Sequence, residues 1–243
     1  MRPRVEIAVQ DPAGAQTAME KGADRIELCT ALALGGLTPS LATIEQAVSV
    51  GIAVHVLIRP RAGDYVYSPA ETAVMVADIR HAVRAGAAGV VVGALTDGDQ
   101  ALDAGALQIL IAAARDENPA VEITVHRCVD VLIENGIHVR DLIDSLRALG
   151  VDRILTSGGA EISRHGADVL EQLRSYAAGR PQIQAGGGIA VKDVAALRGL
   201  DGIHLSAREE RRGGRPGPGG GPGHYDVTSP EVVSAVIAAV SHG

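Results

Sequence analysis

Eight short apolar runs, rich in β-branched residues, recur along the chain, and longer segments with helix signals separate them. Alternation of short strands with helices predicts βα units, whose strands lie parallel in one sheet. Eight such units predict an α/β protein of the (β/α)8 TIM-barrel class, a parallel eight-stranded closed sheet with the helices outside. An open, doubly wound sheet is the structural rival, and the lack of a GxGxxG motif after the first run weakens it. The runs span residues 4–9, 24–29, 53–59, 89–95, 122–127, 152–157, 182–187 and 202–206.

Helix boundary signals lie between these runs. Asp11-Pro12 and Thr38-Pro39 each offer an N-cap followed by proline at the first helical position. The stretch SPAE, residues 68–71, has the pattern of a capping box. Several helical segments then end at glycine, which favours the left-handed backbone of a helix C-terminus.

Length and composition narrow the class of protein. A chain of 243 residues that is 47% hydrophobic fits one barrel domain over 1–243, with the Gly/Pro-rich residues 211–225 as a flexible loop. A net charge of −7 without a basic stripe argues against a nucleic-acid partner. No apolar run approaches the ~20 residues that span a bilayer, and we expect neither a membrane partner nor a secretory signal. Two cysteines make no disulfide framework, which favours a reducing cytoplasm.

Alternation along each predicted strand separates helix-facing from lumen-facing side chains. It turns Glu6, Glu27, Arg59 and His126 inward, with Cys29 one layer above Glu27. Branched apolar residues usually fill a barrel lumen, and buried charges need partners, so we expect Glu6 and Glu27 to meet Arg59 or a histidine. Because barrel active sites lie at the carboxyl ends of the strands, Glu6, Glu27, Arg59 and His126 are the candidate catalytic residues. A purely structural ion network is the alternative.

Glycine loops after the sixth and seventh strands suggest an anion site. Backbone N–H groups in such loops approach phosphate closely, and the rim arginines of the third strand would add charge. Glycine after a strand is also ordinary turn chemistry. The candidate substrate-binding residues are Arg61, Ser157, Gly158, Gly187, Gly188 and Ser206.

The motifs GADRIELC, GGLTPS, IRPRAGDYVYS, HRCVD and RILTSGG, in this order, resemble the CutC family, known as copper homeostasis proteins. The likeness covers about residues 6–206. It implies a cytoplasmic (β/α)8 barrel, a homo-oligomer with a dimer favoured, and copper binding or copper tolerance. The chain departs from the family pattern at Ala8, where members often carry cysteine, at Cys128 and Val129, where alanine and an aromatic residue are usual, and at Ala62, where glycine is usual.

The resemblance makes Cys29 and Cys128, the only thiols, the candidate copper ligands. Cu(I) favours such soft donors. The two cysteines fall on the second and fifth predicted strands, which face each other across the barrel with backbones roughly 14 Å apart. A shared Cu(I) or a disulfide would therefore require loop movement.

Three functions stay open. The first is copper homeostasis through copper ion binding at Cys29, with Cys128 or a histidine. The second is an enzyme acting on a small anionic or phosphorylated metabolite, with Glu27 or Glu6 as base, His126 as acid and Arg59 stabilising charge. The third is a barrel scaffold without catalytic activity.

Overall fold

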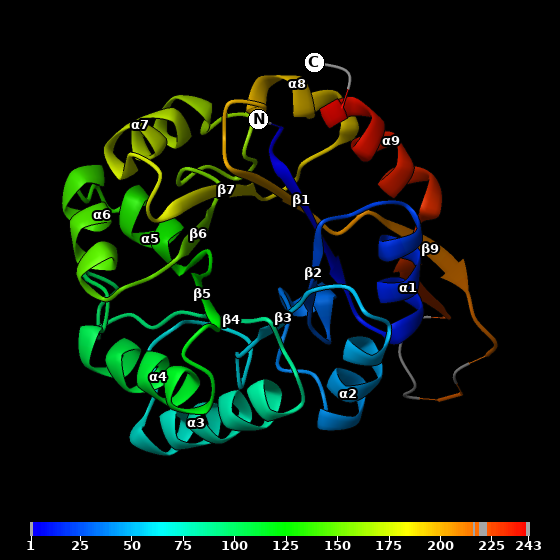
Figure 1. Ribbon diagram of the computed structural model, residues 1–243, viewed down its shortest axis with the longest axis horizontal. Helices are drawn as coiled ribbons and strands as arrows, with labels where there is room; N and C mark the ends of the chain where they lie inside the picture. The colour runs from blue at the N-terminus through cyan, green and yellow to red at the C-terminus, as the bar shows by residue number, and fades with distance from the viewer. Residues whose placement is uncertain (1, 216, 219–222, 242–243) are drawn as a thin grey trace.

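The computed structural model describes residues 2–215, 217–218 and 223–241. It shows a closed barrel of eight parallel strands at the centre of the molecule (Figure 1). Strand β1 pairs with both β2 and β8, which closes the sheet and confirms the predicted TIM barrel. The strands are β1 (Arg4–Val9), β2 (Arg25–Leu28), β3 (Val54–Leu57), β4 (Gly89–Val92), β5 (Glu122–Val125), β6 (Arg153–Thr156), β7 (Gln182–Gly186) and β8 (Gly202–Leu205).

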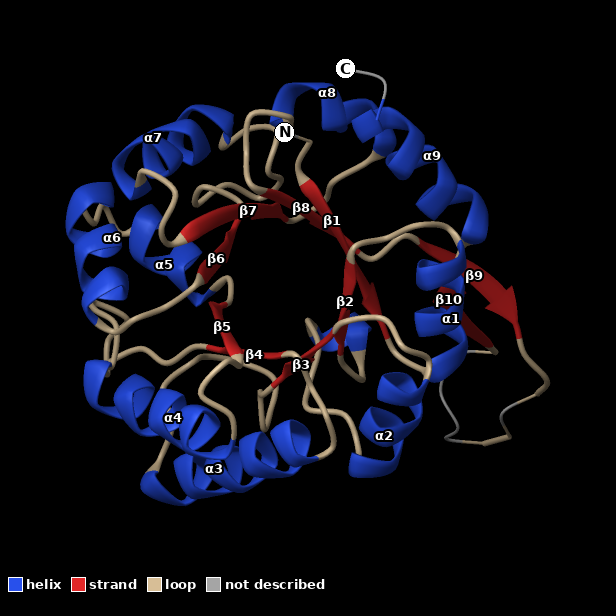
Figure 2. Cartoon of the chain, viewed as in Figure 1, coloured by secondary structure: helices blue, strands red, loops and turns tan. Residues whose placement is uncertain are grey.

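Helices surround the strands as an outer ring (Figure 2). They are α1 (Pro12–Glu20), α2 (Leu41–Ser49), α3 (Pro69–Arg84), α4 (Ala104–Glu117), α5 (Cys128–Glu134), α6 (Val139–Ala148), α7 (Ala167–Ala177), α8 (Val194–Leu197) and α9 (Pro230–Ser241), with 3-10 turns η1 (Leu32–Leu34) and η2 (Val191–Asp193). Among the described helices, none is long and apolar enough to cross a bilayer.

Helix starts follow the capping signals with one exception. The Asp11 carboxylate accepts the backbone N–H of Gly14 at the start of α1, and Ser68 forms a full capping box at the start of α3. Helix α2 starts at Leu41 with Ser40 as its cap, so the prediction of Thr38-Pro39 as its start is wrong. The Thr38 hydroxyl instead accepts the backbone N–H of Arg59 (2.9 Å), which ties the β2–α2 loop to the end of β3.

The apolar core lies between the strands and the helices. Outward-facing residues such as Val5, Ile7 and Ile26 are fully buried against the helical shell. Each such side chain contributes roughly 1.5–3 kcal/mol by burial. These apolar contacts between the strands and the helices stabilise the barrel. The lumen therefore does not have to supply the apolar core, and it can hold polar side chains.

The predicted flexible loop is in part a hairpin. Strands β9 (Arg208–Arg212) and β10 (His224–Thr228) pair antiparallel, with Arg211 opposite Tyr225, and the hairpin extends beside α1 (Figure 1). The prediction of a loop is therefore wrong at both ends of 211–225, where residues 211–212 pair with residues 224–225 as antiparallel strands. Residues 216 and 219–222 of that segment lie outside the described residues.

Candidate active site at the mouth of the barrel

A buried ion cluster anchors Glu6 of β1. Arg25 Nε donates to Glu6 Oε2 at 2.5 Å, Gln184 Nε2 donates to Oε1 at 2.6 Å, and His204 Nδ1 lies 2.8 Å from the same oxygen. Burial opposes the charged form of Glu6, but the Arg25 charge and the His204 hydrogen bond outweigh it and hold the pKa of Glu6 well below its usual range. Glu6 is therefore a fixed anion whose oxygens are already occupied.

Arg25 is a residue that the sequence prediction missed. It stands two positions before Glu27 on β2, so the alternation that turns Glu27 inward turns Arg25 inward as well. Glu6 was expected to meet Arg59 or a histidine, and it does meet His204, while its arginine partner is Arg25.

A second polar cluster lies toward the amino ends of the strands. Arg153 donates to Glu122 Oε2 (2.8 Å), Gln182 Oε1 (2.9 Å) and Thr124 Oγ1 (3.2 Å). His55 lies 3.5 Å from Glu122, and burial lowers the pKa of His55 to about 4, so this imidazole is neutral. These residues form the floor of the lumen, on the side away from the active end of a TIM barrel.

Glu27 lies one layer nearer the mouth and is held differently. Its side chain is 5% exposed, and its Oε2 is buried without a hydrogen-bond partner among the described residues. Burial raises the pKa of Glu27 to about 7 despite the opposing charge of His204. Glu27 therefore exchanges a proton near neutral pH, which the anchored Glu6 does not.

A cavity of about 670 Å³ opens at the carboxyl ends of the strands. Its wall joins residues from all around the ring, among them the predicted Glu27, Arg59, His126, Gly187, Gly188 and Ser206. Glu6 lies beneath this wall and reaches it through His204, which lines the cavity. A volume of this size accommodates a small metabolite.

Arg59 brings a buried positive charge to the cavity. It is 6% exposed, and it donates to the carbonyl oxygens of Leu34 (3.0 Å), Gly36 (3.1 Å) and Gly63 (2.9 Å). Its guanidinium also lies 5.2 Å from the centre of the Tyr65 ring. Within the described ranges of the chain, no carboxylate forms an ion pair with it, so its charge has no counter-ion.

His126 faces the same cavity as a neutral imidazole. Its Nδ1 accepts the backbone N–H of Cys128 at 3.2 Å, and its ring packs on Tyr65 with centroids 4.9 Å apart. Burial and the Arg59 charge lower the pKa of His126 to about 3. Because Nδ1 accepts, Nε2 carries the proton, and Nε2 is buried without a partner among the described atoms.

The glycine loop after β6 already holds an anion, and it belongs to the chain itself. The Asp130 carboxylate accepts the backbone N–H groups of Ser157 (3.0 Å) and Gly159 (3.1 Å), the Ser157 hydroxyl (2.9 Å) and Arg127 Nε (2.7 Å). The N–H of Gly158 donates to Thr156. Ser157 and Gly158, which were predicted to bind the substrate's anion, thus donate to Asp130 and Thr156 of the chain itself, and neither lines the cavity.

The loop after β7 remains open to the cavity. Gly187 has φ +123°, a backbone conformation that residues with a β-carbon rarely adopt, and the Arg127 guanidinium lies against the loop at this position. Arg61, by contrast, lies outside the cavity wall, where it pairs with Glu71 (2.5 Å) and Asp64 (2.9 Å). The predicted inward position of Arg61 is wrong, because it lies beyond the end of β3 in the β3–α3 loop.

Known proteins share this fold and much of the sequence. The family model described as the CutC family matches residues 3–209. This chain belongs to the CutC family. A CutC family protein of Xylella fastidiosa strain Temecula1 is 39% identical over 98% of this chain and 89% of its own length. One from Agrobacterium fabrum is 42% identical over 79% of this chain and 73% of its own length.

A solved structure agrees with that assignment. The crystal structure named as the copper homeostasis protein CutC from Streptococcus agalactiae superposes with a TM-score of 0.76 at 30% identity, covering 84% of this chain and 98% of that one. The family match ends within β9, so most of the β9–β10 hairpin lies beyond it.

The two cysteines of this CutC-family chain do not fit a shared Cu(I) ion. Cys29 packs with Leu57 and Val91 in a small cluster, whereas Cys128 begins α5 and belongs to the main core. The prediction of Cys128 on a strand is wrong. Both thiols are free and buried, and burial raises the pKa of each, with nearby carboxylates adding to the shift. A site that needs thiolate is disfavoured by such surroundings.

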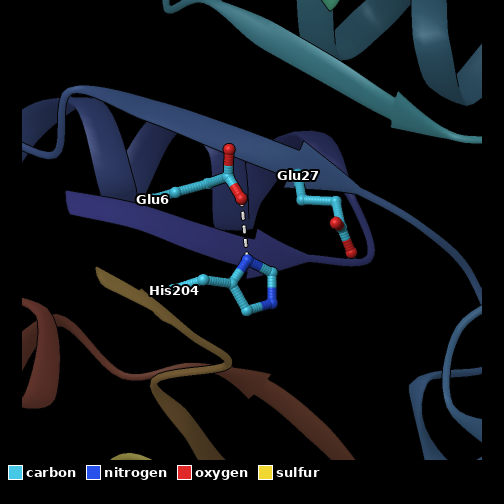
Figure 3. A group of neighbouring side chains, drawn as sticks. All are labelled: Glu6, Glu27 and His204. Atoms are coloured by element: carbon cyan, nitrogen blue, oxygen red, sulfur yellow. Dashed lines mark hydrogen bonds and ion pairs between the residues drawn. The ribbon is translucent and has the colours of Figure 1, made fainter. Parts of the chain in front are cut away.

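A metal ion that prefers oxygen and nitrogen ligands would have few free donors at the cluster of Glu6, Glu27 and His204. One atom each of Glu6, Glu27 and His204 lies within 4.8 Å of the others, as a metal site requires (Figure 3). Glu6, however, already accepts hydrogen bonds from Arg25, Gln184 and His204. Glu27 and one nitrogen of His204 remain, which is fewer than the three protein ligands usual in a catalytic zinc site.

Proposed function

We propose that this CutC-family chain is an enzyme that performs acid–base chemistry on a small anionic metabolite bound at the mouth of the barrel. One observation carries the proposal. Arg59 is a buried cation on the cavity wall, and no carboxylate of the described chain neutralises it. An uncompensated buried charge is costly, and an anionic ligand would compensate it.

Other charges on the cavity wall are compatible with an anion. Asp130 lines the cavity but pairs with Arg127 at 2.7 Å. Glu134 and Glu161 also line it, yet both are exposed at the rim. Salt and water screen exposed charges much more than buried ones, so Glu134 and Glu161 offset little of the charge of the buried guanidinium.

The roles of the side chains follow from their protonation. Glu27 is the base, because a carboxyl group with a pKa of about 7 is partly ionised at neutral pH. The pKa of His126, about 3, makes it a poor source of protons, so the acid role foreseen for it becomes that of a neutral hydrogen-bond donor through Nε2. The open loop at Gly187 and Gly188, with Ser206, holds the far end of the ligand.

A thermal-shift screen tests this proposal. We expect inorganic phosphate and small phosphorylated or carboxylated metabolites to raise the melting temperature, and Arg59→Gln to abolish the shift. Arg84→Gln is the matched control, since Arg84 lies exposed on α3 and pairs with Glu117 (2.6 Å). A shift that survives in Arg59→Gln, or a screen without any shift, contradicts the proposal.

Copper ion binding and copper homeostasis stand as a second proposal, which rests on the name of the Streptococcus agalactiae relative. The geometry of Cys29 and Cys128 weighs against a copper site shared by the two. Titration with Cu(I) against a competing chelator separates the proposals: stoichiometric uptake that Cys29→Ala removes supports the copper site. Equal uptake by the wild type and Cys29→Ala rules out Cys29 as a ligand.

We further propose a cytoplasmic location and a homo-oligomer, with a dimer favoured. Two free cysteines support a reducing compartment. Light scattering on the purified protein measures the subunit count, and a monomeric mass would refute the dimer.

A further inference from the structure

Glu6, Glu27 and His204 meet from three neighbouring strands, β1, β2 and β8 (Figure 3). Glu27 and His204 both line the cavity, whereas Glu6 lies behind His204. The cavity wall thus brings together a carboxyl group and an imidazole, and one ligand atom of each lies within 4.8 Å of the other.

We propose that Glu27 and His204 form a proton-transfer pair that moves a proton between adjacent positions of a carbonyl-bearing anion, as in an isomerisation, with Glu6 as the positioning residue. This inference rests on the proposed function and names its reaction class and a second catalytic residue. His204 was not among the residues predicted to be catalytic.

The tautomer of His204 follows from its neighbours. Glu6 is ionised, because Arg25 and Gln184 hold its oxygens, so His204 Nδ1 is the donor in the 2.8 Å contact. Nε2 is then the nitrogen left to exchange a proton with a ligand or with Glu27. Burial opposes protonation of this imidazole, but the Glu27 charge and the Glu6 hydrogen bond raise the pKa of His204.

The free oxygen of Glu27 completes the pair. Oε2 is buried and has no hydrogen-bond partner among the residues that the structure describes. A buried polar atom left without a partner costs free energy. Glu27 lines the cavity, so a C–H acid bound there meets a carboxylate that can act as a base without breaking an existing hydrogen bond.

The steps balance without an oxidant or another reactant. The Glu27 carboxylate takes the proton from a carbon beside the carbonyl, and the C–H electron pair forms a C=C bond. The carbonyl oxygen becomes an enolate, which accepts a hydrogen bond from Nε2–H of His126. In an anion with a hydroxyl group beside the carbonyl, His204 Nε2–H then gives its proton to the former carbonyl carbon, and the C=C electron pair forms the new C–H bond. The O–H electron pair of the hydroxyl group forms the new C=O bond, and the hydroxyl proton passes to the former carbonyl oxygen. The proton on Glu27 returns to His204, which restores both groups.

Deuterium exchange followed by NMR tests the pair, with binding measured in parallel on the same samples. The probes are dihydroxyacetone phosphate, glyceraldehyde 3-phosphate and ribose 5-phosphate in D₂O, after treatment of the protein with EDTA. We expect at least one probe to bind and to exchange its carbon-bound hydrogen. Glu27→Gln and His204→Gln should slow this exchange at least about 100-fold while binding changes less than about threefold.

Matched variants separate chemistry from folding. Glu45→Gln on α2 and His81→Gln on α3 change exposed residues and should leave the exchange rate unaltered. Gln at position 204 retains an N–H donor for Glu6, so this variant is expected to fold. Glu6→Gln should lower the midpoint of the pH–rate profile, because it removes the charge that favours protonated His204; in the wild type, ¹⁵N NMR of His204 should show a midpoint above 6.5, the ordinary value.

The other possible results distinguish failure of the proton-transfer pair from failure of the proposed function. Binding without exchange in the wild type overturns the proton-transfer pair and leaves the anion proposal standing. Exchange that His204→Gln does not slow overturns the role of His204. Exchange that appears only after Mg²⁺, Mn²⁺ or Zn²⁺ is added overturns the pair in favour of a metal. Absence of binding by every probe and by inorganic phosphate contradicts the proposed function itself.

Discussion

Replacing Glu27 by glutamine should make the protein less sensitive to rising pH. Glu27 is buried, and its raised pKa means that the folded protein prefers the neutral carboxyl group. The unfolded chain ionises this group freely. Glutamine has nearly the same shape and never ionises, so the variant removes only the part of the stability that depends on this proton.

The size and the sign follow from linkage. Between pH 4.5 and 7 the folded state binds more protons at Glu27 than the unfolded state. The stability that this proton contributes to the folded protein is therefore fully present below pH 4.5 and is lost as the pH rises through 7. With a pKa of about 7 in place of 4.5, and about 1.4 kcal/mol for each pKa unit, the full loss is about 3 kcal/mol. Between pH 5 and pH 8.5 we expect ~2 to 3 kcal/mol of it.

Urea denaturation at pH 5 and pH 8.5 measures this effect. The free energy of unfolding of Glu27→Gln, relative to that of the wild type, should rise by ~2 to 3 kcal/mol between pH 5 and pH 8.5. The slope of the unfolding free energy against urea concentration should stay the same. Glu45→Gln, an exposed substitution on α2, should show no such change. Equal pH dependence in the wild type and Glu27→Gln would refute the reasoning, because it would mean that Glu27 ionises in the folded protein as easily as in water.

Two further substitutions probe the groups that support the site. Arg25→Met removes the arginine partner of the buried Glu6 carboxylate, so urea denaturation at pH 7 should show a loss of ~3–5 kcal/mol. A loss below about 1 kcal/mol would mean that Glu6 does not depend on this partner. Asp130→Asn removes the charge that holds Arg127 and the β6 loop, and it should cost ~2–4 kcal/mol and weaken phosphate binding. Unchanged binding and stability in Asp130→Asn would show that the loop holds its shape without this anion.

The barrel can be predicted from the sequence because the same alternation of strand and helix signals recurs along the chain. Every unit carries a short apolar run followed by a helical segment, so an error in one unit leaves the count and the alternation intact. Alternation also places Glu6 and Glu27 in the lumen, because it depends only on local side-chain period. The start of α2 was misplaced because Thr38, a good cap by residue type, makes a tertiary hydrogen bond to Arg59 instead.

The hydrogen-bond partners of the lumen side chains were harder to predict than the direction in which these side chains point. The pairing of Glu6 with Arg25 and Gln184 depends on how β1, β2 and β7 are staggered, which no local pattern encodes. Asp130 lies in the first turn of α5, and its partner Ser157 lies 27 residues away in the glycine loop after β6. The glycine loop after β6 surrounds a carboxylate of the chain itself, and the glycine pattern alone does not distinguish such a carboxylate from a bound ligand.

The most direct measurement of the central claim is a crystal structure of the protein with the phosphorylated compound that gives the largest thermal shift. The account predicts that the compound lies in the mouth cavity, with its negative charge facing Arg59 and its carbonyl end between Glu27 and His126. A compound bound on the outer helices, or at the mouth with Arg59 still facing no anion, would contradict it.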